Sequence, residues 1–272
     1  MSFTILGGSG FIGSRLAMEL RASGEEVFAP GRDDGAYLSR ELGHVIYCVG
    51  VTSDFHSRPL DTVDAHVAAL MPLLRCGRFE SLLYLSSTRV YRGCADGRED
   101  AILSLRVEAS DDLYNTSKLM GEAICLASGR PSMRVVRLSN VYGEGMSRKT
   151  FLASILRDAV ETGLMHLNTT PDSRKDYLSL DDLTPLLPRI AAAGRHRIYN
   201  VASGSNVTNG ELAQRISHLT GCRIGIAANA RSSVFPQISI DRAQREFGFA
   251  PARLEEHLPA LVEFMRREMV AA

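Results

Sequence analysis

The sequence predicts an α/β protein with a doubly wound parallel sheet and a small α+β region toward its C-terminal end. Two patterns support this expectation. Short apolar runs alternate with helical patterns through the first half of the chain, and a glycine-rich turn directly follows the first run. The length of 272 residues is enough to bury one large core or two small ones.

The apolar runs of the first half predict strands that alternate with helices. We expect strands over residues 3–6, 27–29, 45–49, 82–85 and 135–138. We expect helices over residues 11–23, 60–74 and 112–127, with Pro72 kinking the end of the second helix. Strands in such alternation form a parallel sheet that helices cover on both faces.

The second half has a less regular pattern. Thr208 and Glu211 fit a capping box that opens a helix. Residues 254–269 fit a terminal amphipathic helix, although Pro259 speaks against an uninterrupted one. We therefore expect the smaller, mixed region to lie here.

Composition and charge limit which binding partners and which cellular compartment we expect for this protein. Lys plus Arg and Asp plus Glu each number 31, which gives no reason to expect a nucleic acid or an anionic membrane as partner. No apolar run is long enough to cross a bilayer, and the first six residues lack the basic start of a signal peptide, so we expect a cytoplasmic protein. Five scattered cysteines without a CxxC pair predict reduced thiols rather than disulfides or a metal site.

The glycine-rich turn at positions 7–13, GGSGFIG, follows the first predicted strand. Gly7 permits a tight turn, Gly10 lets the backbone approach a pyrophosphate, and Gly13 lets the next helix pack against the sheet. Phe11 and Ile12 begin that helix, whose free N–H groups and partial positive charge attract phosphates. A purely structural glycine turn is the weaker alternative, so we expect a Rossmann-type domain that binds a dinucleotide.

The end of the second predicted strand bears on which dinucleotide binds. NAD-binding sheets place an acidic residue there to hold the ribose hydroxyls, whereas an arginine accommodates the 2′-phosphate of NADP. Gly31 stands at the acidic position and Arg32 follows it. Arg32 therefore favours NADP(H), because a guanidinium pairs with a phosphate that a carboxylate repels. NAD(H) stays possible if Arg32 is only a surface residue and Asp33 or Asp34 holds the ribose.

Tyr114 and Lys118 are the second anchor, four residues apart in a predicted helix and so on one face. A lysine ammonium one turn from a phenol favours the phenolate and lowers the pKa of the tyrosine. Tyr114 would then serve as a general acid or base near neutral pH. A YxxxK pair alone is a common accident, but it is specific in combination with the glycine turn.

With both anchors present, nearly the whole chain resembles the extended short-chain dehydrogenase/reductase family, in particular its nucleotide-sugar epimerases, dehydratases and reductases. Five further segments resemble motifs of that family. They are LYLSSTRVY at 83–91, RLSNVYG at 137–143, RKDYLSLDD at 174–182, YNVASG at 199–204 and FGFAP at 247–251.

The resemblance implies a division of the chain and an assembly. Residues 1–145, with about 175–201, would form the Rossmann-type domain, and residues 146–174 and 202–272 would bind the nucleotide of the substrate. It also implies a homodimer in which helices around 60–74 and 112–127 pair across a two-fold axis.

The resemblance also implies roles for the catalytic residues. Ser87 would hydrogen-bond the reacting oxygen, and Tyr114 would exchange the proton. Lys118 would bind the nicotinamide ribose and tune Tyr114. Val49 and Gly50 stand in the loop that this family places beside the cofactor.

Three residues would contact the substrate. Thr88 would be a second polar contact to the sugar, Asn140 would help to hold the substrate, and Arg231 would bind the substrate pyrophosphate. Strand-end hydrogen bonding is the weaker structural alternative for Ser87 and Thr88. Capping or surface charge is an equal alternative for Asn140 and Arg231.

The chain departs from the family pattern in several places. Only about fifteen residues separate the second and third predicted strands, so one strand and an adenine-contacting Asp are expected to be missing. His66 stands where the family usually has Asn, and Arg92 replaces a Gly. The loop at 49–51 reads VGV in place of LAA. These changes affect the expected cofactor contacts rather than the fold.

The residues after Ser87 bear on the reaction. Dehydratases of the family place an Asp-Glu pair there, whereas this chain has Thr88 and Arg89, which argues against water elimination. Together with Arg32, this favours NADPH-dependent reduction of a keto-sugar nucleotide, with Tyr114 as the proton donor. The alternatives are an epimerase of the same substrates that keeps NAD tightly bound and, less favoured, a non-catalytic protein that senses dinucleotides.

Overall fold

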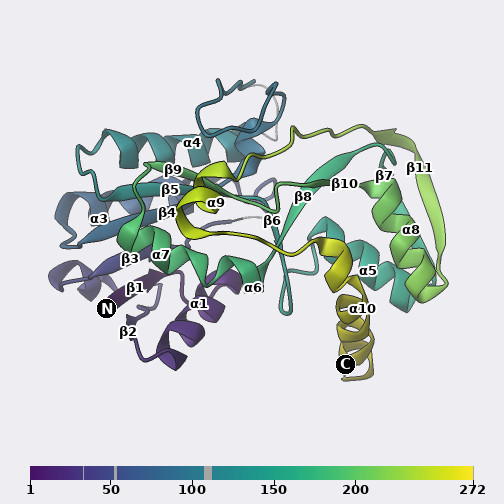
Figure 1. The fold of residues 1–272 in the computed structure, drawn as a ribbon, viewed down its shortest axis with the longest axis horizontal. Coiled ribbons are helices and arrows are strands. Elements are labelled where there is room, and N and C mark those ends of the chain that lie inside the picture. The colour runs from purple at the N-terminus through teal and green to yellow at the C-terminus, as the bar shows by residue number, and fades with distance from the viewer. Residues whose placement is uncertain (33, 52–53, 107–111, 272) are drawn as a thin grey trace.

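The expected doubly wound sheet is present in the computed structural model, which describes residues 1–32, 34–51, 54–106 and 112–271 (Figure 1). Six strands, all parallel, lie in the order β2-β1-β3-β4-β5-β9. Their bounds are β1 Ser2–Leu6, β2 Glu26–Phe28, β3 His44–Tyr47, β4 Ser81–Ser87, β5 Met133–Leu138 and β9 Ile198–Val201. The Rossmann-type fold class is therefore confirmed.

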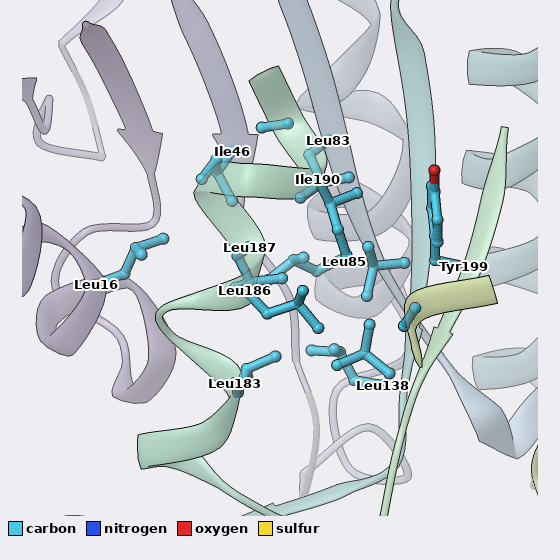
Figure 2. Close-up of a cluster of buried hydrophobic side chains, with 14 of the residues drawn as sticks. Leu16, Ile46, Leu83, Leu85, Leu138, Leu183, Leu186, Leu187, Ile190 and Tyr199 are labelled. Atoms are coloured by element: carbon cyan, nitrogen blue, oxygen red, sulfur yellow. The ribbon is translucent and has the colours of Figure 1, made fainter. Parts of the chain in front are cut away.

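Helices cover both faces of this sheet, because its strands carry apolar side chains on both sides. On one face α1 (Phe11–Ala22), α6 (Leu180–Leu183) and α7 (Leu186–Ala193) pack onto the sheet, as the buried cluster in Figure 2 shows. On the other face lie α3 (Leu70–Cys76) and α4 (Asp112–Ala127). This burial on two sides explains why the strands read as continuous apolar runs rather than as alternating ones.

The strand β2 forms one edge of the sheet and pairs with β1 alone. A single 3-10 turn, η1 (Gly35–Ser39), then leads to β3 on the other side of β1. The expected loss of one strand is thus confirmed. The strand order reverses at β1, and ligands of such sheets bind in the crevice beyond the strand ends at this reversal.

The expected kink at Pro72 is wrong. Pro72 lies in the first turn of α3, where a missing N–H costs little. The irregularity comes earlier, because α2 (Pro59–Val63) continues as a π-helical segment, η2 (Asp64–Ala68). Hydroxyls from the sheet hold the carbonyls of this segment: Tyr47 donates to Ala65 at 2.7 Å and Tyr84 donates to His66 at 3.1 Å.

The second half adds two small sheets and three long helices. β6 (Asn140–Tyr142), β8 (Arg174–Ser179) and β10 (Asn206–Thr208) form one sheet, and β7 (Leu164–Thr169) pairs with β11 (Arg223–Arg231). A second apolar core joins α5 (Phe151–Glu161), α8 (Asn209–Thr220) and α10 (Leu254–Ala271). Two short helices, η3 (Thr88–Tyr91) and α9 (Asp241–Phe247), complete the fold.

Two details of this half concern the sequence predictions. The capping box of Thr208 and Glu211 opens α8 as expected, and α10 runs through Pro259. The division into residues 1–145 with 175–201 and residues 146–174 with 202–272 stays a prediction. In the described part of the chain no helix is long and apolar enough to span a membrane, and the five cysteines are free thiols.

Candidate active site

A cavity of about 600 Å³ opens beyond the carboxyl ends of the central strands, between the large sheet and the second half of the chain. It is lined by nine of the residues proposed from the sequence. They are Phe11, Ile12, Val49, Gly50, Ser87, Thr88, Tyr114, Lys118 and Asn140. The fold therefore brings segments from five separate stretches of sequence into one crevice, where open α/β sheets bind ligands.

The glycine turn lies at the sheet end of this cavity and leaves no room for side chains. Gly7 has a φ of +83°, which only glycine adopts readily. A Cβ on Gly13 would lie 2.3 Å from the carbonyl oxygen of Gly7. Gly10 caps α1 without a side-chain bond, so the first N–H groups of that helix are open to an anion. The turn fits the pyrophosphate of a dinucleotide.

Gly50 lies in the loop after β3, where little space is left for a side chain. A Cβ at this position would lie 3.3 Å from Nε2 of His66 and 3.4 Å from Nζ of Lys118. The loop after β3 therefore packs closely against η2 and α4, and its backbone lies beside Lys118.

Ser87 and Thr88 stand where β4 ends and η3 begins. The Ser87 hydroxyl accepts a hydrogen bond from the Arg89 backbone N–H at 3.2 Å, so it caps the short helix. Thr88 is buried and lines the same cavity. The strand-end hydrogen bond named as the alternative is present for Ser87, and the same hydroxyl also forms a side-chain hydrogen bond with Tyr114.

Tyr114 lies at the floor of the cavity and is 4% exposed. Burial raises its pKa, and the hydroxyl of Ser87 and the guanidinium of Arg89 oppose that effect. Arg89 lies over the Tyr114 ring, 5.4 Å from its centroid. The expectation that Lys118 lowers the pKa of Tyr114 is therefore wrong: burial raises this pKa, and the groups that oppose the rise are Ser87 and Arg89.

Lys118 lies one helical turn after Tyr114 on α4. Its Nζ donates to the carbonyl oxygen of Leu85 at 2.8 Å and lies 5.2 Å from the centre of the Tyr84 ring. Burial lowers the pKa of Lys118 to about 7, and the carboxylate of Glu122 opposes that shift. The ammonium keeps donor capacity for a hydroxyl-bearing ligand such as a ribose.

The outer end of the cofactor crevice is open. Arg32 is exposed after β2 and is not among the residues that line the cavity. One carboxylate oxygen of Asp34 accepts the backbone N–H of Ala36 at 3.0 Å and caps η1, while Asp33 lies outside the described residues. The choice between the two dinucleotides therefore stays a prediction.

The geometry can be set beside known proteins. A family model described as the NAD dependent epimerase/dehydratase family matches residues 3–202. The chain belongs to this family. The resemblance found in the motifs is thereby confirmed, as is the expectation of an NAD(P)-dependent enzyme.

Individual proteins and solved structures are also similar to this chain. A dTDP-4-dehydro-6-deoxy-D-allose reductase from Streptomyces bikiniensis is 23% identical, over 80% of each chain. The structure of MoeE5 in complex with UDP-glucose and NAD has a TM-score of 0.83 at 21% identity and covers 99% of this chain and 100% of its own. RMD from Pseudomonas aeruginosa complexed with NADPH gives 0.80 at 21%, covering 98% and 100%. At such identity these structures show the shared fold.

For this epimerase/dehydratase family member, two of the expected substrate residues occupy different places. Asn140 lines the cavity, but its amide also donates to the Asp176 carbonyl oxygen at 2.8 Å and so ties β6 to β8. Arg231 is exposed at the end of β11 and does not line the cavity. The alternative of surface charge thus fits Arg231 better.

Lys175, to which the sequence motifs assign no role, also lines the cavity. Lys175 on β8 lies over the Phe151 ring at 4.9 Å, at the start of α5. Burial, followed by the charge of Arg89, lowers the pKa of Lys175 to about 8. A sequence signal existed: the chain has only three lysines, Lys118, Lys149 and Lys175, and all three line this cavity.

Proposed function

We propose that the protein catalyses NADPH-dependent reduction of a keto group on a nucleotide-linked sugar. The observation that carries this proposal is the convergence of Ser87, Tyr114 and Lys118 on one cavity with the glycine turn at its edge. The bound cofactor would supply a hydride to the carbonyl carbon. The chain itself has to bind the sugar, polarise the carbonyl and deliver one proton.

The proton would come from Tyr114. Its O–H bond breaks as the new O–H bond forms on the substrate oxygen, and the phenolate is reprotonated afterwards from solvent. Ser87 would donate a hydrogen bond to the same oxygen while negative charge develops on it. Lys118 would hold the nicotinamide ribose through its ammonium group.

Binding of the nucleotide is assigned to the second half of the chain. Lys175 and the N-terminus of α5 both face the cavity, and together they offer a positive charge and free N–H groups to phosphate oxygens. We infer that they contact the substrate diphosphate, with Thr88 and Asn140 near the sugar. The division of the chain at about residue 145 follows from the same assignment.

Reduction is favoured over the other reactions of the family by two sequence positions. Thr88 and Arg89 follow Ser87, so the acid–base pair that elimination requires has no counterpart there. Arg32 favours the phosphorylated cofactor, which a reductase consumes and releases. The relative described as a dTDP-4-dehydro-6-deoxy-D-allose reductase supports the same choice.

The test is cofactor oxidation with a panel of nucleotide-linked keto-sugars. We expect NADPH to be consumed in an amount equal to the ketone reduced. Interconversion of a nucleotide sugar without net consumption of added cofactor, with NAD retained through purification, would instead establish the epimerase. Absence of both activities in a protein that binds a dinucleotide would favour a sensor.

We also propose that the protein is a homodimer. Apolar side chains on adjacent helices are exposed, among them Leu60 on α2 and Leu113 and Met120 on α4. Helices with such faces bury them against a second copy in two-fold assemblies. Light scattering at micromolar concentration should give twice the chain mass, and a monomer would refute the proposal.

A further inference from the structure

A buried ion pair lies directly behind the catalytic residues. Glu122 on α4 and Arg137 on β5 are 3% and 4% exposed. Nη2 of Arg137 donates to Glu122 Oε2 at 2.7 Å, and its Nε lies 3.1 and 3.2 Å from the two carboxylate oxygens. Ser86, which precedes Ser87, donates its hydroxyl to Oε1. A pair of this kind is often no more stable than an apolar replacement, so stability alone does not explain it.

The pair has a definite orientation toward the site. Tyr114, Lys118 and Glu122 follow one another at intervals of four residues, so they share one face of α4. The far side of Arg137 faces away from them, because its Nη1 donates to the Tyr91 hydroxyl at 2.7 Å and to the Glu99 carbonyl oxygen at 3.3 Å. The carboxylate is therefore the end of the pair that faces Lys118.

A negative charge is needed to stabilise the Lys118 ammonium ion in this buried place, because the other groups around it are neutral. Burial raises the pKa of the Cys48 thiol to about 12, and burial and the charge of Lys118 lower the pKa of His66 to about 2. Both groups are therefore neutral near pH 7. The rings of Tyr84 and Tyr114 are neutral as well, since burial raises the pKa of each phenol.

We propose that Glu122 is a positioning residue that holds Lys118 as an ammonium ion, and that Arg137 and Ser86 fix its carboxylate for this task. The proposal builds on the function proposed above, in which Lys118 acts in its charged form. Its physical content is separate, because the charge state of Lys118 can be measured without substrate or cofactor.

The direct test is the titration of Lys118 by NMR in protein labelled with ¹³C,¹⁵N-lysine. Three lysines give three side-chain signals, and Lys149→Arg and Lys175→Arg assign them. Removing a neighbouring opposite charge shifts a titration by about 1–3 pH units. We therefore expect the Lys118 midpoint in Glu122→Gln to fall by about one pH unit or more. Glu246→Gln, which removes a carboxylate outside the cavity, should leave that midpoint unchanged.

A second variant tests the same proposal even if Glu122→Gln does not fold. Glu122→Met combined with Arg137→Met removes both charges without stranding either one in the core. It should lower the Lys118 midpoint in the same direction. An unchanged midpoint in a folded Glu122→Gln protein, or in the folded double variant, overturns the proposal.

The pH dependence of catalysis links this charge to function. If turnover requires the Lys118 ammonium, activity falls as pH rises through the pKa of Lys118. The high-pH limb of kcat/KM should then move to lower pH in Glu122→Gln, and Glu122→Asp, which restores a carboxylate, should move it back toward wild type. A Lys118 midpoint that shifts while this limb stays fixed would support the positioning role and contradict the proposed function of Lys118.

Discussion

The floor of the cavity and the outer end of the cofactor crevice are built differently. At the floor, Tyr114 and Lys118 are each 4% exposed and touch groups from β4, the π segment and the loop after β3. At the outer end, β2 has three residues and one neighbouring strand, and Arg32 after it is exposed. Many elements constrain the first place and few constrain the second, so substitutions should have large effects at the floor and small ones at β2.

The largest effect is expected for Tyr114→Phe. The change removes the transferable proton but keeps the ring, so turnover should fall by about 10²–10⁴-fold, the usual contribution of a positioned acid. Cofactor affinity should change little. Tyr199→Phe is the matched control, since it removes a hydroxyl bonded to Glu246 outside the cavity. Its turnover should stay near wild type, and equal losses in the two variants would contradict the role of Tyr114.

The next largest effect is expected when an alanine replaces a glycine in each of the two regions, because the space available for the added methyl group differs. A Cβ on Gly13 would lie 2.3 Å from backbone, whereas a Cβ on Gly31 at the outer end meets nothing within 4 Å. Gly13→Ala should lower the free energy of unfolding by about 1–3 kcal/mol and weaken cofactor binding. Gly31→Ala should leave both near wild type. Denaturant unfolding and fluorescence titration measure the two quantities, and similar behaviour of both variants would remove the contrast.

A pH effect is expected on the substrate side. Lys175, with its pKa lowered to about 8 by burial, is charged below that pH and neutral above it. Substrate KM should therefore rise by up to about tenfold per pH unit above 8. Lys175→Arg keeps the charge over this range and should flatten the rise. A KM that climbs equally in both proteins would assign the titration to another group.

The smallest effect is expected at the exposed end. Arg32→Ser should weaken NADPH binding by about fivefold, because an exposed ion pair contributes about 1 kcal/mol at most. NADH binding should not change, since that cofactor lacks the 2′-phosphate. Calorimetric titration of both cofactors checks this, and a preference of the wild-type protein for NADH would favour the epimerase.

The sequence predicts the central sheet and the proximity of Tyr114 and Lys118 well, for physical reasons. Buried parallel strands are continuous apolar runs, and residues 114 and 118 share a helix face by periodicity alone. The pKa direction of Tyr114 could not be predicted, because it depends on burial by segments distant in sequence. The π segment depends on hydroxyls of Tyr47 and Tyr84 reaching it across the core. Strands β6 and β10 have three residues each, too few to show a period.

The lysine distribution has a practical consequence for handling the protein. All three lysines line one cavity, and every other basic side chain apart from histidine is an arginine. Amine-directed reagents, such as activated esters for fluorophores or for coupling to a solid support, therefore meet their side-chain targets in this cavity. Lys149 is the most accessible target, with 68% of its side chain exposed. Attachment through an engineered cysteine would leave the lysines of the cavity unmodified. Acylation of the wild-type protein with increasing amounts of reagent would instead modify these lysines progressively.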